Sequence, residues 1–99
     1  LQAAREAAAA SAVLLRNVHG MLPLSAAHLD RIAVIGPLAD DGHEQLGTWI
    51  FDGDPEHSRT PLHAIREAAG SSVEVRFARA METTRSRSRD GFAEAVEAG

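Results

Sequence analysis

The chain has 99 residues, enough for one small domain, and its ten arginines, with no lysine, stand against 14 acidic residues to leave a formal net charge of −4. This balance argues against a general nucleic-acid binder, and the absence of cysteine excludes a disulfide scaffold, a thiolate metal site and a thiol nucleophile. No apolar run approaches the roughly 18 to 20 residues that cross a bilayer, so we expect neither a membrane-spanning segment nor a membrane partner. The compartment stays undetermined, because proteins without cysteine occur in oxidising and reducing environments alike. Nineteen of the apolar residues are alanine, which predicts a thin core.

The first predicted element is an alanine-rich helix, since alanine is the best helix former. Its apolar positions follow helical spacing: Leu1, Ala4, Ala8, Ala12 and Leu15. The pattern ends near residues 17–20, which suit a C-cap and a turn. A last helix is predicted after Asp90 as N-cap, and the sequence stops after about two turns of it. Because both ends fall within helical composition, we expect the chain to be a piece of a longer polypeptide.

A strand, a helix and a second strand are predicted in the middle of the chain. Residues 32–35 form a β-branched run closed by a Gly-Pro pair. Thr60 fits an N-cap, with proline at the first helical position, for a helix that ends before Gly70. Residues 73–77 then alternate between apolar and polar with period two. The predicted fold class is α/β with a parallel βαβ unit, and because two parallel strands do not make a stable sheet, we expect an incomplete fragment that needs strands from outside the chain.

Residues 38–59 are predicted to form a long loop, rich in Asp, Gly and His, of the kind that often carries function. The loop contains Trp49 and Phe51. Large aromatic side chains in a polar loop either anchor the loop to the body of the domain or form a stacking wall for a ring-shaped ligand such as a sugar. Composition alone favours anchoring and leaves the binding role open.

No other pattern predicts a metal or cofactor. The acidic stretch 52–56 resembles a calcium loop, but His57 and His63 stand where that loop needs Gly and Glu. The five histidines form no pair at metal-ligand spacing, and a chain without lysine has no phosphate loop. The arginine-serine run 85–89 is a weak signal for RNA, because no aromatic residues interleave it, and a solvated loop is the favoured interpretation.

Several spaced strings together resemble the opening of the second domain in glycoside hydrolase family 3. They are AAREAA at 3–8, SAVLLRN at 11–17, LPL at 22–24, IAVIGPLAD at 32–40, GTW at 47–49, RT at 59–60 and FAEAV at 92–96. The resemblance covers nearly the whole chain and is strongest to bacterial β-glucosidase-like members. Arg16 departs from it, since many members have lysine there, and residues 83–89 match no family motif.

The resemblance implies a parent protein with a (β/α)8-type barrel followed by an α/β sandwich domain, with the active site at their junction. Residues 1–20 then form the helix and linker that enter the sandwich domain, and residues 21–99 form its N-terminal part. It also implies retaining hydrolysis of terminal β-glycosidic bonds by two carboxylates. The nucleophile is an Asp of the preceding barrel and the acid/base is usually a Glu beyond Gly99, so no catalytic residue is assigned here. No motif supports moving either role onto Glu44, Glu56, Glu67 or Glu94.

In some members of the family an aromatic residue of the loop after the first sandwich strand helps to form the wall of the leaving-group subsite, and the resemblance makes Trp49 and Phe51 both candidates for that position. The expected partners are a carbohydrate substrate, the barrel and the rest of the sandwich domain, with no cofactor and no nucleic acid. We expect the 99-residue piece to be inactive alone. The rival hypothesis is a non-catalytic α/β interaction or sugar-binding module that completes its sheet by self-association.

Overall fold

The computed structural model describes all residues, 1–99. Its helices and strands are α1 (Gln2–Ser11), β1 (Arg31–Ile35), α2 (Pro61–Ala69), β2 (Glu74–Ala78) and α3 (Phe92–Ala98). Short 3-10 turns lie between them at Val18–Gly20, Ala26–His28, Glu44–Leu46 and Pro55–His57. None of the helices has the length and apolar character needed to cross a membrane.

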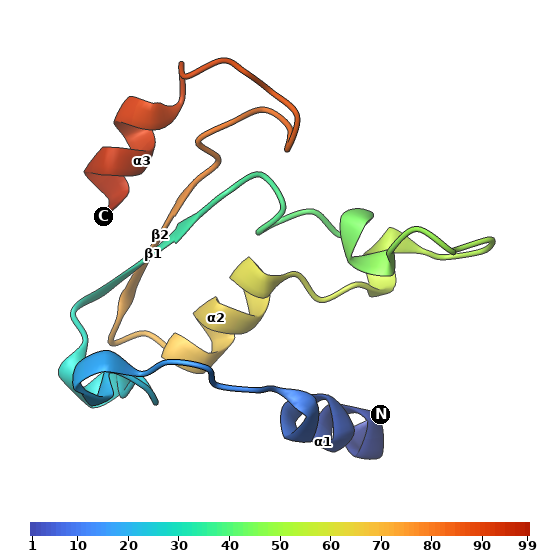
Figure 1. Ribbon diagram of the computed structural model, residues 1–99, viewed down its shortest axis with the longest axis horizontal. Helices are drawn as coiled ribbons and strands as arrows, with labels where there is room; N and C mark the ends of the chain where they lie inside the picture. The colour runs from blue at the N-terminus through green and yellow to red at the C-terminus, as the bar shows by residue number, and fades with distance from the viewer.

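The two strands form a parallel sheet in which Arg31 lies opposite Glu74 and Ile35 lies opposite Ala78. Figure 1 shows α2 on one side of this sheet and α3 on the other. The register explains the arrangement, because alternate residues of a strand point to opposite faces. Ile32 shares an apolar hollow with α2, while Arg76, which belongs to the other face, reaches α3. The predicted α/β class and the parallel βαβ unit are confirmed.

Helix α2 begins and ends where its sequence signals predict. The Thr60 hydroxyl accepts a hydrogen bond from the His63 amide at 3.2 Å, and proline follows at the first helical position. At the other end Gly70 adopts a φ of 67°, a left-handed value that favours glycine, and its amide bonds to the Arg66 carbonyl. These local signals fix the helix that covers the inner face of the sheet.

The core is thin, as the alanine content predicts, and it lies between the sheet and its two helices. The buried apolar residues are Val34, Leu62, Ala69, Val73, Ala78 and Ala98. Leu62, only 1% exposed, is the one large side chain that is fully buried. On the α3 side the buried residues are alanines, which allow the helix to lie close to the strands. The larger apolar residues of α3, Phe92 and Val96, remain exposed.

The first helix is shorter than its spacing predicts, and the prediction of a helix reaching residues 12–15 is wrong. It ends at Ser11, whose hydroxyl donates to the Ala8 carbonyl at 2.8 Å, and Ala12 is already extended. None of the residues of α1 is buried. Isolated short helices are marginal in water, and most helical stability in proteins comes from packing, so intrinsic propensity alone does not extend this helix.

The predicted cap of the last helix is also wrong by one residue. The N-cap is Gly91, with no side-chain cap, and the Asp90 amide instead donates to the Ser88 hydroxyl at 3.1 Å. The preceding segment is already folded into turns that use serine hydroxyls as acceptors, and Asp90 completes the last of them.

Candidate functional site

Two long connections leave the sheet at the same end. Residues 36–60 follow β1 and residues 79–91 follow β2, and because the strands are parallel, both segments begin at the carboxyl edge. In open α/β sheets ligands bind outside the carboxyl ends of the strands. This edge is therefore the part of the fold where a functional site is expected.

The connection after β1 is closed at its base by hydrogen bonds. The Thr60 hydroxyl donates to Asp40 Oδ1 at 2.8 Å, and the Leu62 amide donates to the Ala39 carbonyl at 2.8 Å. These two bonds bring the outgoing and returning ends of the loop together at the start of α2. The loop between them, residues 40–60, is called the aromatic loop below.

Within the aromatic loop, an aspartate side chain accepts backbone amide hydrogen bonds at the start of each short 3-10 turn. Asp41 Oδ1 accepts from the amides of His43 and Glu44, both at 3.0 Å, and Asp54 Oδ1 accepts from the Glu56 amide at 2.9 Å. The two arms also touch, because a Cβ on Gly42 would lie 2.8 Å from the Pro55 carbonyl oxygen. Glycine is needed at this position for the close backbone approach.

The tip of the aromatic loop presents two aromatic side chains to solvent. Trp49 is 88% exposed and Phe51 is 92% exposed. Ile50, between them, is half-buried, and its Cδ1 would lie 3.4 Å from a Cβ on Gly53, which also packs against Leu46. Because the middle residue points inward, its neighbours point outward. Neither aromatic residue packs against the rest of residues 1–99, so within this chain both rings are free for contact with a ligand.

A hollow of about 550 Å³ lies beside the tip. Its lining residues are His43, Glu44, Gly47, Thr48, Ile50, Phe51 and Gly53. Phe51 contributes to this wall, whereas Trp49 lies outside it. An aromatic ring next to hydroxyl, imidazole and carboxylate groups is the kind of lining that suits a sugar, which presents both CH faces and hydroxyl groups.

Three of the carboxylates in the aromatic loop are engaged by the loop itself. Asp41 and Asp54 accept backbone amides in the two turns, and Asp40 accepts from Thr60. The five histidines are exposed. No group of three or more His, Asp or Glu side chains lies close enough to hold a metal ion. The loop therefore contains side chains for contact with a ligand and carboxylates that maintain its shape.

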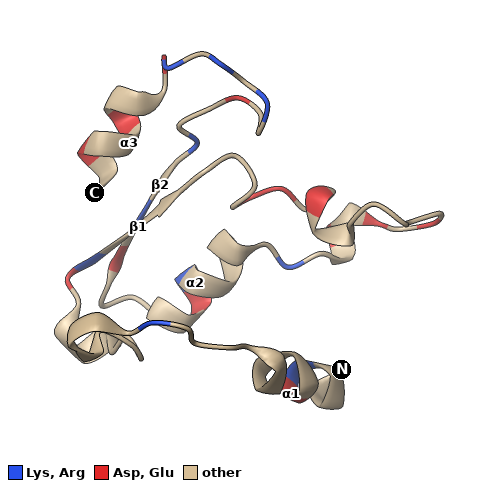
Figure 2. Ribbon diagram, in the orientation of Figure 1, with Lys and Arg blue, Asp and Glu red and all other residues tan.

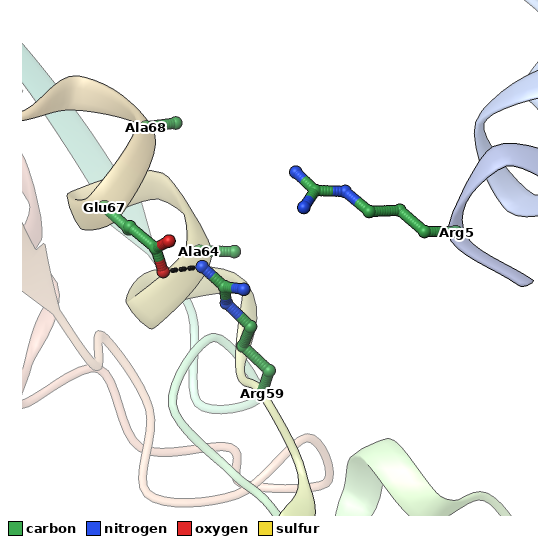
Figure 3. Close-up of a pocket in the computed structure, with 5 residues that line it drawn as sticks. All are labelled: Arg5, Arg59, Ala64, Glu67 and Ala68. Carbon is green, nitrogen blue, oxygen red and sulfur yellow. Dashed lines mark ion pairs between the residues drawn. The ribbon is translucent and has the colours of Figure 1, made fainter. Parts of the chain in front are cut away.

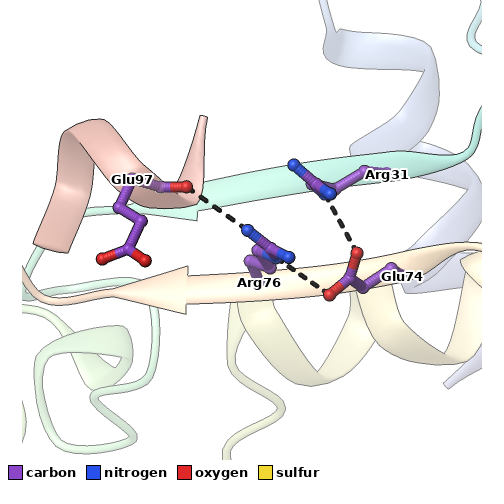
Figure 4. A network of polar contacts seen from close by, with 4 residues as sticks. All are labelled: Arg31, Glu74, Arg76 and Glu97. Carbon is purple, nitrogen blue, oxygen red and sulfur yellow. Dashed lines mark hydrogen bonds and ion pairs between the residues drawn. The ribbon is translucent and has the colours of Figure 1, made fainter.

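A polar network that the sequence analysis did not identify lies on the α3 face of the sheet (Figure 4). Glu74 accepts from Arg31 Nε at 2.9 Å and from Arg76 Nε at 2.8 Å, and Arg76 also donates to the Glu97 carbonyl at 3.3 Å. These bonds, first from Arg76 and then from Arg31, lower the pKa of Glu74 below its ordinary value of 4.5. The alternating charges of residues 74–76 signal an exposed strand face, but the pairing depends on the register.

A second hollow, of about 350 Å³, lies between α1 and α2 (Figure 3). Arg59 forms an ion pair with Glu67 there, and Arg5 extends toward it from α1 without a partner. Ala64 and Ala68 complete the lining. Glu67 compensates the charge of Arg59, and both side chains are about half exposed. The hollow therefore holds a solvated ion pair and is not a preformed ligand site.

With this geometry established, comparison with known proteins identifies the family. The model of the glycosyl hydrolase family 3 C-terminal domain matches residues 12–99. The chain belongs to glycosyl hydrolase family 3. The match includes both strands, the aromatic loop and all of α2 and α3, so each element that positions the loop lies within the family 3 domain.

Curated relatives in family 3 agree with this assignment. The chain is 38% identical to the periplasmic beta-glucosidase of Salmonella typhimurium, over 82% of this chain and 10% of that protein. It is 30% identical to a beta-xylosidase of Formosa agariphila, over 96% of this chain and 14% of that protein. It is 36% identical to beta-D-xylosidase 3 of Arabidopsis thaliana, over 73% of this chain and 9% of that protein. The chain thus spans about a tenth of the length of these relatives, and no solved structure gives a significant match.

The glutamates for which family 3 motifs gave no role occupy ordinary surface positions. Glu44 and Glu56 lie in the two 3-10 turns of the aromatic loop, and Glu94 lies in the first turn of α3. Glu67 is paired with Arg59. All four are exposed to solvent.

Proposed function

We propose that this chain is part of a retaining β-glycosidase that removes terminal sugars from β-glycosides, with both catalytic carboxylates outside residues 1–99. The observation that carries the proposal is the family 3 match across residues 12–99, supported by relatives named as a beta-glucosidase and beta-xylosidases. In a retaining mechanism one carboxylate attacks the anomeric carbon, while a second protonates the leaving oxygen and later activates water. The two groups act about 5 Å apart.

Within that enzyme, we assign residues 1–20 to the helix and linker that enter the sandwich domain and residues 21–99 to the N-terminal part of this domain. The exposed apolar side chains of the linker support this division. Val13 is 78% exposed, Leu14 is 60% exposed and Leu15 is 92% exposed. Apolar groups clustered in one solvent-facing segment favour burial against another surface. The barrel and the remaining sandwich strands are the surfaces proposed to cover them.

The role proposed for the chain itself is contact with the substrate through the aromatic loop. The exposure of Trp49 and Phe51, the inward Ile50 and the closed base of the loop support this role, because they present the two rings on an ordered backbone. A sugar CH face packed on one ring contributes about 1 kcal/mol, which changes affinity and leaving-group preference without supplying chemistry. Trp49 and Phe51 remain equal candidates for the ring that touches the sugar.

The proposal is tested by assaying the full-length protein and the isolated 99-residue chain on aryl β-glucosides and aryl β-xylosides. The full-length protein is expected to turn over at least one of them, with a β-configured first sugar product detected by NMR, and the isolated chain is expected to be inactive. Turnover by the isolated chain would contradict the location of the carboxylates outside it. An α-configured first product would contradict retention, and no turnover of either substrate class would contradict the glycosidase assignment.

A further inference from the structure

The connection after β2 contains a cluster of arginines without a role in the site described above. Residues 79–90, called the arginine loop here, contain four arginines and two acids: Arg79, Glu82, Arg85, Arg87, Arg89 and Asp90. The loop therefore carries a charge of +2, whereas the remaining chain carries −6. Figure 2 shows the basic positions spaced along this segment, away from the acidic positions of the aromatic loop. Such local segregation of charge attracts anions to one part of the surface.

The arginines of this loop have no partners within the chain. Arg31, Arg59 and Arg76 each form an ion pair with a glutamate. The four guanidinium groups of the arginine loop form no ion pair and donate no hydrogen bond, and their residues are exposed. Their donors are therefore available to a ligand without breaking an internal contact.

The loop backbone is ordered by its serines, which leaves the arginines free. Ser86 Oγ accepts from the Ser88 amide at 3.2 Å, and Ser88 Oγ accepts from the Asp90 amide at 3.1 Å. The Phe92 amide then donates to the Arg89 carbonyl at 3.0 Å, which joins the loop to α3. Because serine and arginine alternate, the short hydroxyls close the turns and the long cationic side chains extend from them. An ordered backbone lowers the entropy cost of using several arginines together.

The position of the arginine loop connects it to the proposed function. It leaves the carboxyl end of β2, and the aromatic loop leaves the carboxyl end of the neighbouring strand, so both belong to the edge of the sheet where a substrate is expected. We propose that the arginine loop binds the carboxylate groups of acidic oligosaccharides, that is, substrates or products with uronic acid residues beyond the sugar that is cleaved. The inference rests on the proposed glycosidase function and adds a substrate class to it.

The chemistry of the loop favours a short acidic sugar over other anions. Guanidinium groups bind carboxylates through paired hydrogen bonds, a geometry that lysine does not offer. The segment 79–91 contains no aromatic residue on which bases could stack, unlike the usual single-strand binding surfaces. A nucleic acid or an anionic bilayer is large enough to extend beyond the arginine loop, where the charge of −6 on the remaining residues repels it. An oligosaccharide with a few carboxylates is small enough to contact the arginine loop alone.

The test is calorimetric binding of tetragalacturonate to the full-length protein at low ionic strength, with cellotetraose as the neutral probe. Two triple variants are compared. The first, Arg85→Gln/Arg87→Gln/Arg89→Gln, removes three charges from the loop, and a matched control removes three unpaired arginines elsewhere. The control substitutions are Arg5→Gln, Arg16→Gln and Arg66→Gln. Both variants lose the same net charge, and far-UV circular dichroism confirms that each is folded.

We expect the acidic probe to bind about tenfold or more tightly than the neutral one, since several exposed charge pairs each contribute a factor of about two to three. The loop variant is expected to lose this preference and the control to keep it. Equal losses in the two variants, or no preference in the wild type, would overturn the inference. Tighter binding of oligo(dT) or of phosphatidylglycerol vesicles than of tetragalacturonate would overturn it in favour of another partner. Turnover of aryl β-glycosides by the wild type is scored separately, so failure of the proposed glycosidase function is distinguished from failure of this binding site.

Discussion

The Thr60 hydroxyl donates to Asp40 Oδ1 at 2.8 Å while it accepts from the His63 amide at 3.2 Å. One side chain therefore caps helix α2 and closes the base of the aromatic loop. Thr60 itself is buried, at 9% exposure, so both bonds lie partly shielded from solvent. The position of Trp49 and Phe51 thus depends on the same hydroxyl that starts the helix packed on the sheet.

Replacing Thr60 with valine, which keeps the shape and removes the hydroxyl, is expected to lower the local stability of the loop base by about 1 to 2 kcal/mol. Hydrogen–deuterium exchange of the full-length protein measures this as faster exchange in peptides covering residues 39–48 and 61–64. Thr60→Ser keeps the hydroxyl and serves as the control. Equal protection in the valine and serine variants would contradict a dual role for the hydroxyl.

Leu62 is the residue whose truncation is expected to be most destabilising. It is 1% exposed and the one large side chain that is fully buried in a thin core. Leu62→Ala leaves a cavity with few neighbours able to fill it and is expected to cost about 2 to 5 kcal/mol. Chemical denaturation of the full-length protein measures the loss. Leu38→Ala, at a leucine that is 42% exposed, is expected to cost much less, and similar losses at the two sites would show that the core is located elsewhere.

The pairing of Glu74 with Arg76 and Arg31 predicts a dependence of stability on acid. These arginines hold the pKa of Glu74 below its ordinary value of 4.5 in the folded state. A carboxyl whose folded pKa is lowered contributes stability above its unfolded pKa and loses it as the pH falls through the folded value. The contribution is therefore complete near neutral pH and is lost below about pH 4.5.

The variant Glu74→Gln isolates this contribution. Its unfolding midpoint is expected to lie below that of the wild type at neutral pH and to converge with it as the pH falls. Because the side chains are exposed, the difference is expected to be small and to shrink in high salt. A difference that persists at pH 3 or is insensitive to salt would rule out the ion-pair explanation and indicate a packing effect.

The elements that the sequence predicts correctly are those with complete local signals. Thr60, a proline at the first helical position and Gly70 define both ends of α2, and the β-branched run 32–35 defines β1, which begins one residue earlier at Arg31. The prediction extends helix α1 too far because alanine content reflects only intrinsic helix propensity. The helix ends at Ser11, and none of its residues is buried against the rest of the chain.

The candidate site is also predictable from the sequence only in part. The composition of the loop identifies Trp49 and Phe51 as the residues of interest, but composition does not determine whether a ring is buried. That depends on Ile50, which packs near Leu46 and Gly53 and so leaves both neighbours exposed. The network around Glu74 is not predictable without the register, because Arg31 lies 43 residues away in the sequence.

The exposure of Trp49 and Phe51 also separates a binding role from a structural one. Since the side chains are 88% and 92% exposed, Trp49→Ala and Phe51→Ala are expected to leave the stability of the full-length protein nearly unchanged. If one ring packs on the leaving group, its removal is expected to raise KM for aryl β-glycosides about twofold to tenfold, with a smaller change in kcat. The affected variant is also expected to discriminate less between aryl and alkyl leaving groups.

Val96→Ala is the matched control for these two substitutions, because Val96 is an apolar residue that is 81% exposed on α3, outside the aromatic loop. Its steady-state constants are expected to equal those of the wild type. An effect confined to one aromatic position identifies the ring that contacts the sugar. Unchanged KM and leaving-group preference at both positions would remove the aromatic loop from the substrate site, even if the parent enzyme proves to be a β-glycosidase.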